Sequence, residues 1–114
     1  MNKLFEVNGI EFFEEEFQDD INEFQDIVSI LKDFQGELKI EKIQCTDKND
    51  CCFSTKENYI CELVGALTED DDFYTLKELR SNYDKFKDEM LYPFGIQVYK
   101  CIGCNKWMIN LLEE

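Results

Sequence analysis

Six cysteines and the absence of histidine constrain this chain more than any other feature of its sequence. A tetrahedral zinc site needs four nitrogen, sulfur or carboxylate ligands, and without histidine the natural set is four thiolates. Four of the cysteines fall between residues 45 and 61, and the other two are Cys101 and Cys104. A fold that uses them together must therefore bring two distant segments of the chain side by side.

The N-terminal residues do not resemble a secretory signal, because Glu6 interrupts Leu4 and Phe5 before an apolar run can develop. No apolar stretch approaches the roughly 18 residues of a membrane span. We therefore expect a cytoplasmic protein, folded as one domain over residues 1–114. In a reducing compartment, six cysteines favour metal binding or redox chemistry over a disulfide framework.

The N-terminal half of the chain is expected to form a hairpin, a helix and several strands. Asn8-Gly9 between alternating residues predicts a β-hairpin at about 3–13, because this pair readily takes the positive φ angles of a type I′ turn. Apolar residues at helical spacing predict an amphipathic helix over 14–35. Strands are expected at 38–45, 51–54 and 59–67, separated by turn-rich segments.

The C-terminal half is expected to form a second helix and two further strands. Thr75 and Glu78 have the spacing of a capping box and open a predicted helix over 74–91, which Pro93 would stop. Residues 96–100 alternate as a strand, and alternation resumes after Cys104, although this tail also fits a short helix. The fold class is thus α+β: an N-terminal β-hairpin, two amphipathic helices and an antiparallel sheet, in the order ββαβββαββ.

Cys101-x-x-Cys104 is the sharpest local motif. It follows a predicted strand, Gly103 permits a tight turn, and two thiolates at such a turn can reach one tetrahedral ion. With Tyr99 before it and Trp107 after it, the segment resembles a knuckle of the zinc-ribbon class. The other half of the site is expected from Cys45 and from one of Cys51 and Cys52, whereas Cys61 fits a buried apolar position.

The zinc-ribbon resemblance covers only about residues 38–54 and 96–112, and it implies two cysteine hairpins that face each other across a structural zinc ion. The gap after Cys45 is longer than the usual two to four residues. The alternative use of Cys101 and Cys104 is thiol redox chemistry or metal handling. A thioredoxin-like fold is disfavoured, because only ten residues follow Cys104.

The net charge of −14 is unevenly distributed. Residues 1–35 carry −8, residues 36–67 carry −2, residues 68–92 carry −4 and residues 93–114 are neutral. Direct binding to nucleic acid or to an anionic membrane is disfavoured, because both require cationic patches. The absence of histidine and of glycine-rich phosphate loops argues against an enzyme.

Clustered acids have two interpretations: a solvated surface, or a surface that binds a basic protein. We hypothesise the second, in a non-enzymatic protein whose composition is similar to that of small acidic inhibitors, immunity proteins and anti-defence proteins directed at nucleic-acid-handling proteins. A homodimer remains the alternative use of the apolar helix faces. The expected partner-binding residues are, in the first helix, Asp19, Asp20, Glu23 and Asp26, and, as a second patch, Glu69, Asp70, Asp71 and Asp72.

Overall fold

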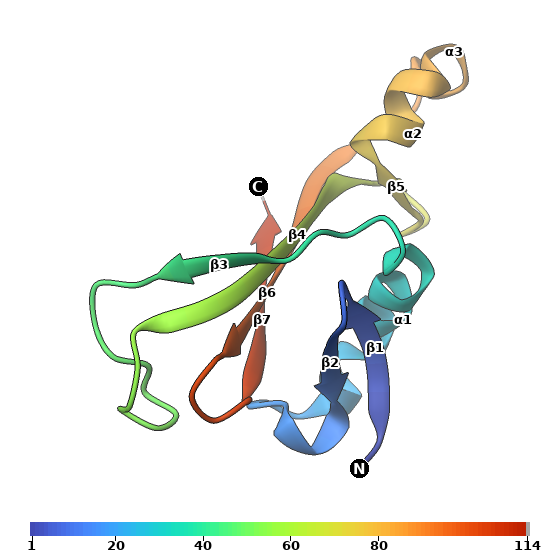
Figure 1. Cartoon of the computed structure of the whole chain (residues 1–114). Helices are drawn as coiled ribbons and strands as arrows, with labels where there is room; N and C mark the ends of the chain where they lie inside the picture. Colours follow the sequence, from blue (N-terminus) through green and yellow to red (C-terminus); the bar gives the residue numbers. More distant parts are fainter. Residues whose placement is uncertain (114) are drawn as a thin grey trace.

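The structure is a computed structural model that describes residues 1–113; Glu114, the last residue of the expected domain, lies outside the described residues. It is a mixed α+β fold with antiparallel sheets (Figure 1). Its elements are β1 (Lys3–Val7), β2 (Ile10–Phe13), the 3₁₀ turns η1 (Glu14–Glu16) and η2 (Ile21–Phe24), α1 (Gln25–Phe34), β3 (Glu41–Gln44), β4 (Glu57–Leu67), β5 (Phe73–Thr75), α2 (Leu76–Ser81), α3 (Tyr83–Phe86), β6 (Tyr92–Cys101) and β7 (Trp107–Glu113).

The predicted N-terminal hairpin is confirmed. β1 and β2 pair antiparallel, with Val7 opposite Ile10. Asn8 and Gly9 both have positive φ angles, of 51° and 85°, as a type I′ turn requires. The Asn8 side chain also accepts a hydrogen bond from the backbone N–H of Ile40, at 2.7 Å, and so ties the hairpin to the chain that leads into β3.

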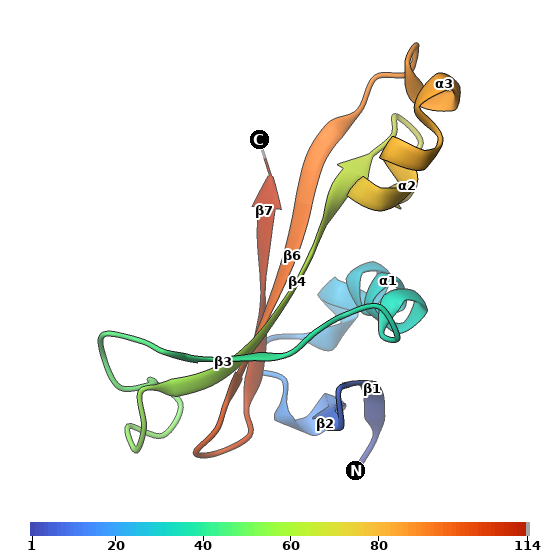
Figure 2. The same ribbon diagram turned by 45° about the horizontal axis from the view of Figure 1, so that its top comes forward.

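The main sheet is built around the long strand β4. Along one edge β4 pairs with β6, and along the other it pairs with β3 at one end and with β5 at the other. β7 pairs with the far edge of β6, which gives the order β3-β4-β6-β7. Turning the molecule shows the hairpin and α1 on one face of this sheet, with α2 and α3 at the end away from the β3–β4 and β6–β7 loops (Figure 2).

Trp107 lies at the centre of the core between the hairpin and the sheet. It is fully buried, and the rings of Phe5, Phe12 and Phe17 lie 5.5, 5.4 and 4.5 Å from its own. Its indole Nε1–H donates to the carbonyl oxygen of Phe13 at 2.7 Å, which satisfies its polar group without water. The start of β7, directly after the cysteine turn, is therefore firmly anchored.

The prediction of one continuous helix over 14–35 is wrong in its first half. Glu14–Glu16 form only a 3₁₀ turn, and the chain then extends through Phe17. Gln18 donates its backbone N–H to the carbonyl oxygen of Trp107 at 3.0 Å, and Phe17 is buried against the Trp107 ring. Backbone pairing with β7 therefore takes the place of a helix at these residues. Helical structure begins again at η2, which the Asp20 side chain caps by accepting from the N–H of Asn22.

The prediction of a strand at 51–54 is also wrong. The N–H groups of Cys52 and Phe53 both donate to the carbonyl oxygen of Asn49, and Phe53 has a φ of 54°. This segment is a series of turns in the β3–β4 connection. Three strands do lie between the two helical regions, but the last of them is β5, whose Tyr74 and Thr75 the prediction assigns to the start of the second helix.

The second helix is shorter than the predicted span of 74–91. The Thr75–Glu78 capping box is present, with both reciprocal hydrogen bonds, and opens α2. Asn82 interrupts the helix with φ −122° and ψ 36°, and residues 87–91 lead into β6 without helical structure. The C-terminal tail is a strand, β7, as its alternation indicated.

Within residues 1–113, the helices are all too short or too polar to cross a lipid bilayer.

Candidate metal centre

Four cysteine sulfur atoms meet where two hairpin loops of the main sheet converge. Cys51 and Cys52 come from the β3–β4 loop, Cys101 ends β6, and Cys104 lies in the β6–β7 turn. All four Sγ atoms lie within 4.8 Å of one another, although the two loops are separated by the whole of β4, α2 and β6 in the sequence. Two sulfur–sulfur contacts join the loops: Cys51 Sγ to Cys104 Sγ at 3.1 Å, and Cys52 Sγ to Cys101 Sγ at 3.5 Å.

Asn49 shapes the β3–β4 loop that carries Cys51 and Cys52. Its backbone N–H donates to the carbonyl oxygen of Thr55, and its own carbonyl accepts from Cys52 and Phe53. Its side-chain Nδ2 donates to the carbonyl oxygen of Glu57 at 3.1 Å and to Cys101 Sγ at 3.2 Å. One polar residue therefore folds the loop and also holds it against the end of β6.

The β6–β7 turn approaches the first loop closely at Gly103. A Cβ atom on Gly103 would lie 2.5 Å from Ser54 Oγ and 3.3 Å from Cys52 Sγ, so a larger residue would require the Ser54 side chain to move. The positive φ angle in this turn belongs instead to Asn105, at 69°. Gly103 thus matters because it lets the two loops touch, and not because it makes the turn possible.

The thiols of the cluster differ in how readily they ionise. Burial opposes ionisation of Cys101, but hydrogen bonds from the Asn49 side chain and the Cys104 backbone outweigh it and lower the pKa to about 6. The hydrogen bond with the Ser54 hydroxyl, at 3.0 Å, lowers the pKa of Cys52. Burial, together with hydrogen bonding to Cys104, raises the pKa of Cys51. A metal cation would therefore find one thiolate already formed and would displace protons from other thiols.

Both members of the Cys51–Cys52 pair belong to the cluster, where the sequence indicated one of them together with Cys45. Cys45 lies outside the group of four, at the end of β3, and its Sγ accepts from Asn58 Nδ2 at 3.4 Å. It shares with Cys51 and Cys101 the lining of an adjacent cavity of about 410 Å³. Cys61 is buried in the core, as its apolar neighbours indicated, and burial raises its pKa to about 12.

Sequence reasoning did not identify Asn49 and Ser54 as partners of the thiols. Neither has a diagnostic spacing relative to the cysteines, because each acts through a loop conformation that only the folded chain defines. The adjacent pair Cys51-Cys52 was the available signal: two neighbouring cysteines in a turn can both face one ion when the backbone leaves the extended conformation.

The eight predicted partner-binding acids are all exposed, but they do not form one surface element. Asp19 and Asp20 precede η2, Glu23 lies within it, and Asp26 lies in α1. Glu69–Asp72 form a tight turn between β4 and β5, where the buried Thr68 accepts from the N–H groups of Asp70 and Asp72. The ion pairs of residues 1–113 use none of these eight carboxylates.

Comparison with known proteins gives no family for this chain. Its sequence matches no protein-family model, and no curated protein or solved structure is significantly similar to it.

Proposed function

We propose that this protein is a non-enzymatic interaction module in which a structural zinc ion, bound by Cys51, Cys52, Cys101 and Cys104, joins two loops of the sheet and acidic surfaces bind a basic protein. The observation that carries the proposal is the convergence of four thiols from two distant segments. The proposed role is that of an inhibitor, immunity or anti-defence factor acting on a nucleic-acid-handling protein.

The geometry of the four thiols supports zinc. Zn–S bonds of about 2.3 Å place the sulfur atoms of a tetrahedral site roughly 3.8 Å apart. The sulfur separations in the cluster include 3.1 and 3.5 Å and do not exceed 4.8 Å, so small movements of the loops would centre an ion. Asn49 and Ser54 would supply the outer hydrogen bonds that fix ligands and stabilise thiolate charge.

A four-thiolate site favours a structural role over a catalytic one. All four tetrahedral positions would be filled by protein, which leaves none for water or substrate. A loop of more than ten residues and a turn that the four sulfurs bring together would gain stability from the ion. We therefore propose that the metal fixes the scaffold and that binding takes place elsewhere on the molecule.

The acidic surface supports a basic protein as partner. All eight predicted partner-binding carboxylates are exposed and make no ion pair within residues 1–113, so their charge is free to attract a cationic surface. Such attraction accelerates association and selects among partners more than it sets affinity. The same charge would repel nucleic acid and anionic lipid.

Metal analysis tests the structural site. Protein purified without chelator or added metal should contain about one zinc per chain, and four of its six thiols should become reactive toward a thiol reagent only when a chelator is added. Cys104→Ser should lose the metal, whereas Cys45→Ser should retain it. Correctly folded protein without metal, or with iron or copper in place of zinc, would contradict the proposal.

A thiol redox role, expected from the sequence for Cys101 and Cys104, is the second candidate, and the 3.1 Å contact with Cys104 favours Cys51 as its partner. Without a metal, an oxidant could take two electrons and two protons from this pair and join the loops by a disulfide. Mass spectrometry distinguishes the two functions. Rapid loss of two hydrogen masses when an oxidant is added to the protein as purified, blocked by Cys104→Ser, would favour the redox role.

Charge reversal tests the basic partner. The variant combines Asp19→Lys, Glu23→Lys and Asp26→Lys with Asp20→Asn, which keeps an N-capping side chain. Immobilised wild-type protein should retain a basic protein from a lysate at about 50 mM salt and release it at about 500 mM, because salt screens exposed charges. Equal retention by the variant would show that these acids do not contribute.

A further inference from the structure

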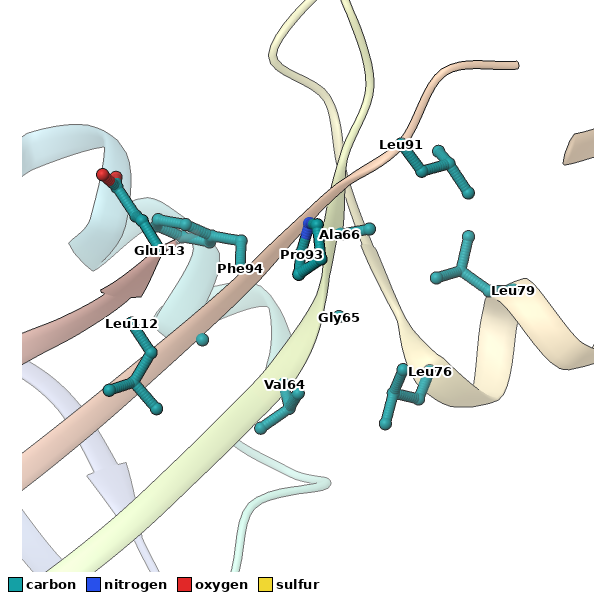
Figure 3. Close-up of a pocket in the computed structure, with 11 residues that line it drawn as sticks. Val64, Gly65, Ala66, Leu76, Leu79, Leu91, Pro93, Phe94, Leu112 and Glu113 are labelled. Carbon is teal, nitrogen blue, oxygen red and sulfur yellow. The ribbon is translucent and has the colours of Figure 1, made fainter.

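An apolar groove of about 380 Å³ lies at the end of the sheet away from the cysteines (Figure 3). Val64, Gly95 and Leu112 are neighbours across β4, β6 and β7. Gly95 has no side chain, and Leu112 leans over it so closely that an added Cβ would meet Leu112 Cδ1 at 3.2 Å. Small residues in the centre of the sheet therefore leave a hollow, and Leu76 and Leu79 of α2 form its other wall.

The lining of this groove is exposed although it is apolar. Val64, Leu76 and Leu112 expose 38%, 42% and 42% of their surface, and Tyr92, nearby on β6, exposes 47%. The alternate residues Leu63 and Ile96 point to the opposite face of the sheet, where they are buried in the core with side chains of α1 and the hairpin. Contiguous exposed apolar side chains of this kind are typical of binding grooves.

A second, acidic cavity adjoins the groove. It has a volume of about 320 Å³, and its lining includes Glu69, Asp70 and Asp72 from the β4–β5 turn together with Asp88 and Glu89. The linings of the two hollows reach consecutive residues, since Met90 lines the acidic cavity and Leu91 lines the groove. With Glu113 of the groove, the two linings hold six carboxylates and no lysine or arginine.

We infer that this groove binds an extended segment of a basic partner protein, in which an apolar side chain enters between Leu76 and Leu112 and flanking lysines or arginines meet the acidic cavity. The inference rests on the proposed function, which expects a positively charged partner. It adds the position at which that partner binds and the chemistry of the contact. Apolar burial supplies the anchor, and the six carboxylates select a cationic flank.

Charge argues against a second copy of this chain as the occupant. Two copies would bring net charges of −14 together, and the rim of each groove is itself acidic. A basic segment gains attraction at the same position where a second copy would incur repulsion. The groove and its rim are thus complementary to one class of partner.

A defined peptide tests the inference on the metal-bound full-length protein. The probe is an unstructured peptide in which two leucines are flanked by lysines, with one control peptide carrying serine for leucine and another carrying glutamate for lysine. Titration should shift the amide resonances of Val64, Gly95 and Leu112. Each control peptide should bind about tenfold more weakly, because each lacks one of the two required interactions.

Leu112→Lys and Met108→Lys form the matched pair of variants. Both residues lie on the same face of β7, both are apolar, and they expose 42% and 39% of their surface, but only Leu112 lines the groove. Leu112→Lys should weaken peptide binding about tenfold and Met108→Lys less than about threefold. Amide spectra that keep their dispersion show that both variants fold.

Four outcomes would overturn the inference. These are no binding at millimolar peptide, equal effects of the two variants, shifts confined to residues 19–26, and a protein dimer that Leu112→Lys dissociates. Shifts confined to residues 19–26 would reject the groove but leave the proposed basic partner intact. If reversing the charges at residues 19–26 does not weaken retention of a basic protein, but the peptide still shifts the amide resonances of the groove, only the acidic surface around α1 is rejected.

Discussion

Asn49 joins both loops of the candidate metal centre, although it is not one of the four clustered cysteines. Its Nδ2 group contacts Cys101 Sγ at 3.2 Å, and its Oδ1 accepts from Asn58 Nδ2 at 2.8 Å. That network continues to Cys45, whose sulfur accepts from the same Asn58 amide at 3.4 Å. Asn58 is itself buried, so loss of Asn49 would leave buried polar groups without partners.

We predict that Asn49→Ala weakens zinc affinity by about 10- to 100-fold, because outer hydrogen bonds orient ligands and stabilise thiolate charge. Competition with a chromophoric chelator measures the affinity. Asn82→Ala is the matched control, since it also removes a hydrogen bond donated by an asparagine Nδ2, to the carbonyl oxygen of Glu78 at 2.9 Å, but between α2 and α3, at the end of the sheet away from the cysteines. Equal losses in the two variants would assign Asn49 to general stability alone.

β4 is the element on which both ends of the molecule depend. Near Glu57 it begins beside the cysteine loops, and near Leu67 it ends beside the groove. Gly65 permits the closest approach in this strand: a Cβ atom there would lie 2.0 Å from the backbone oxygen of Tyr74 in β5. Since backbone cannot move aside as a flexible side chain can, any larger residue would separate β5 from β4.

We predict that Gly65→Ala lowers the free energy of unfolding by more than about 2 kcal/mol and weakens peptide binding in the adjoining groove. Gly36→Ala is the matched control, because an added Cβ at Gly36 has no atom within 4 Å and its φ is not positive. That variant should leave stability unchanged or raise it by up to about 1 kcal/mol. Urea denaturation of both proteins measures the difference, and similar midpoints would contradict the steric argument.

Local rules predicted the elements that depend on neighbouring residues alone. The Asn8-Gly9 hairpin, the Thr75–Glu78 capping box and the strand 59–67 follow from turn chemistry, capping and alternation, and all three are present. The errors occur where distant residues compete. Trp107 draws Phe17 and Gln18 out of the predicted helix, and the Asn49 carbonyl folds residues 51–54 into turns.

The candidate site was predictable in its chemistry but not in its membership. Cysteine count, spacing and the lack of histidine pointed to a four-thiol cluster containing Cys101 and Cys104. Choosing Cys51 and Cys52 together over Cys45 depends on the loop conformation that Asn49 imposes, which no spacing rule contains. The groove was less predictable still, since it arises from Gly95 meeting Leu112 across strands.

At the scale of the whole molecule, the β3–β4 and β6–β7 loops, which carry the cysteine cluster, lie at one end of the main sheet, and α2, which lines the groove, lies at the other (Figure 1). The cluster lies in nearly neutral segments, and the groove borders a turn with four consecutive acids. Within residues 1–113 only four ion pairs form, all of them with lysine, and the remaining acids repel one another. Added salt should therefore stabilise the folded protein, because it screens this repulsion.

We predict that the melting temperature rises between about 10 and 500 mM sodium chloride, because salt screens self-repulsion more than it weakens the few exposed ion pairs.

Neutralising the β4–β5 turn with Glu69→Gln, Asp70→Asn, Asp71→Asn and Asp72→Asn should raise the melting temperature at low salt and reduce the further rise that salt produces. Asparagine also suits the left-handed φ of 64° at Asp71, so the turn is preserved. For a chain of this size, a gain of about 1 kcal/mol corresponds to roughly 4 °C. Calorimetry of the metal-bound proteins measures both effects. A melting temperature that falls as salt is added would mean that native ion pairs outweigh repulsion. That result would contradict the proposal that the unpaired acids are free to bind a basic partner.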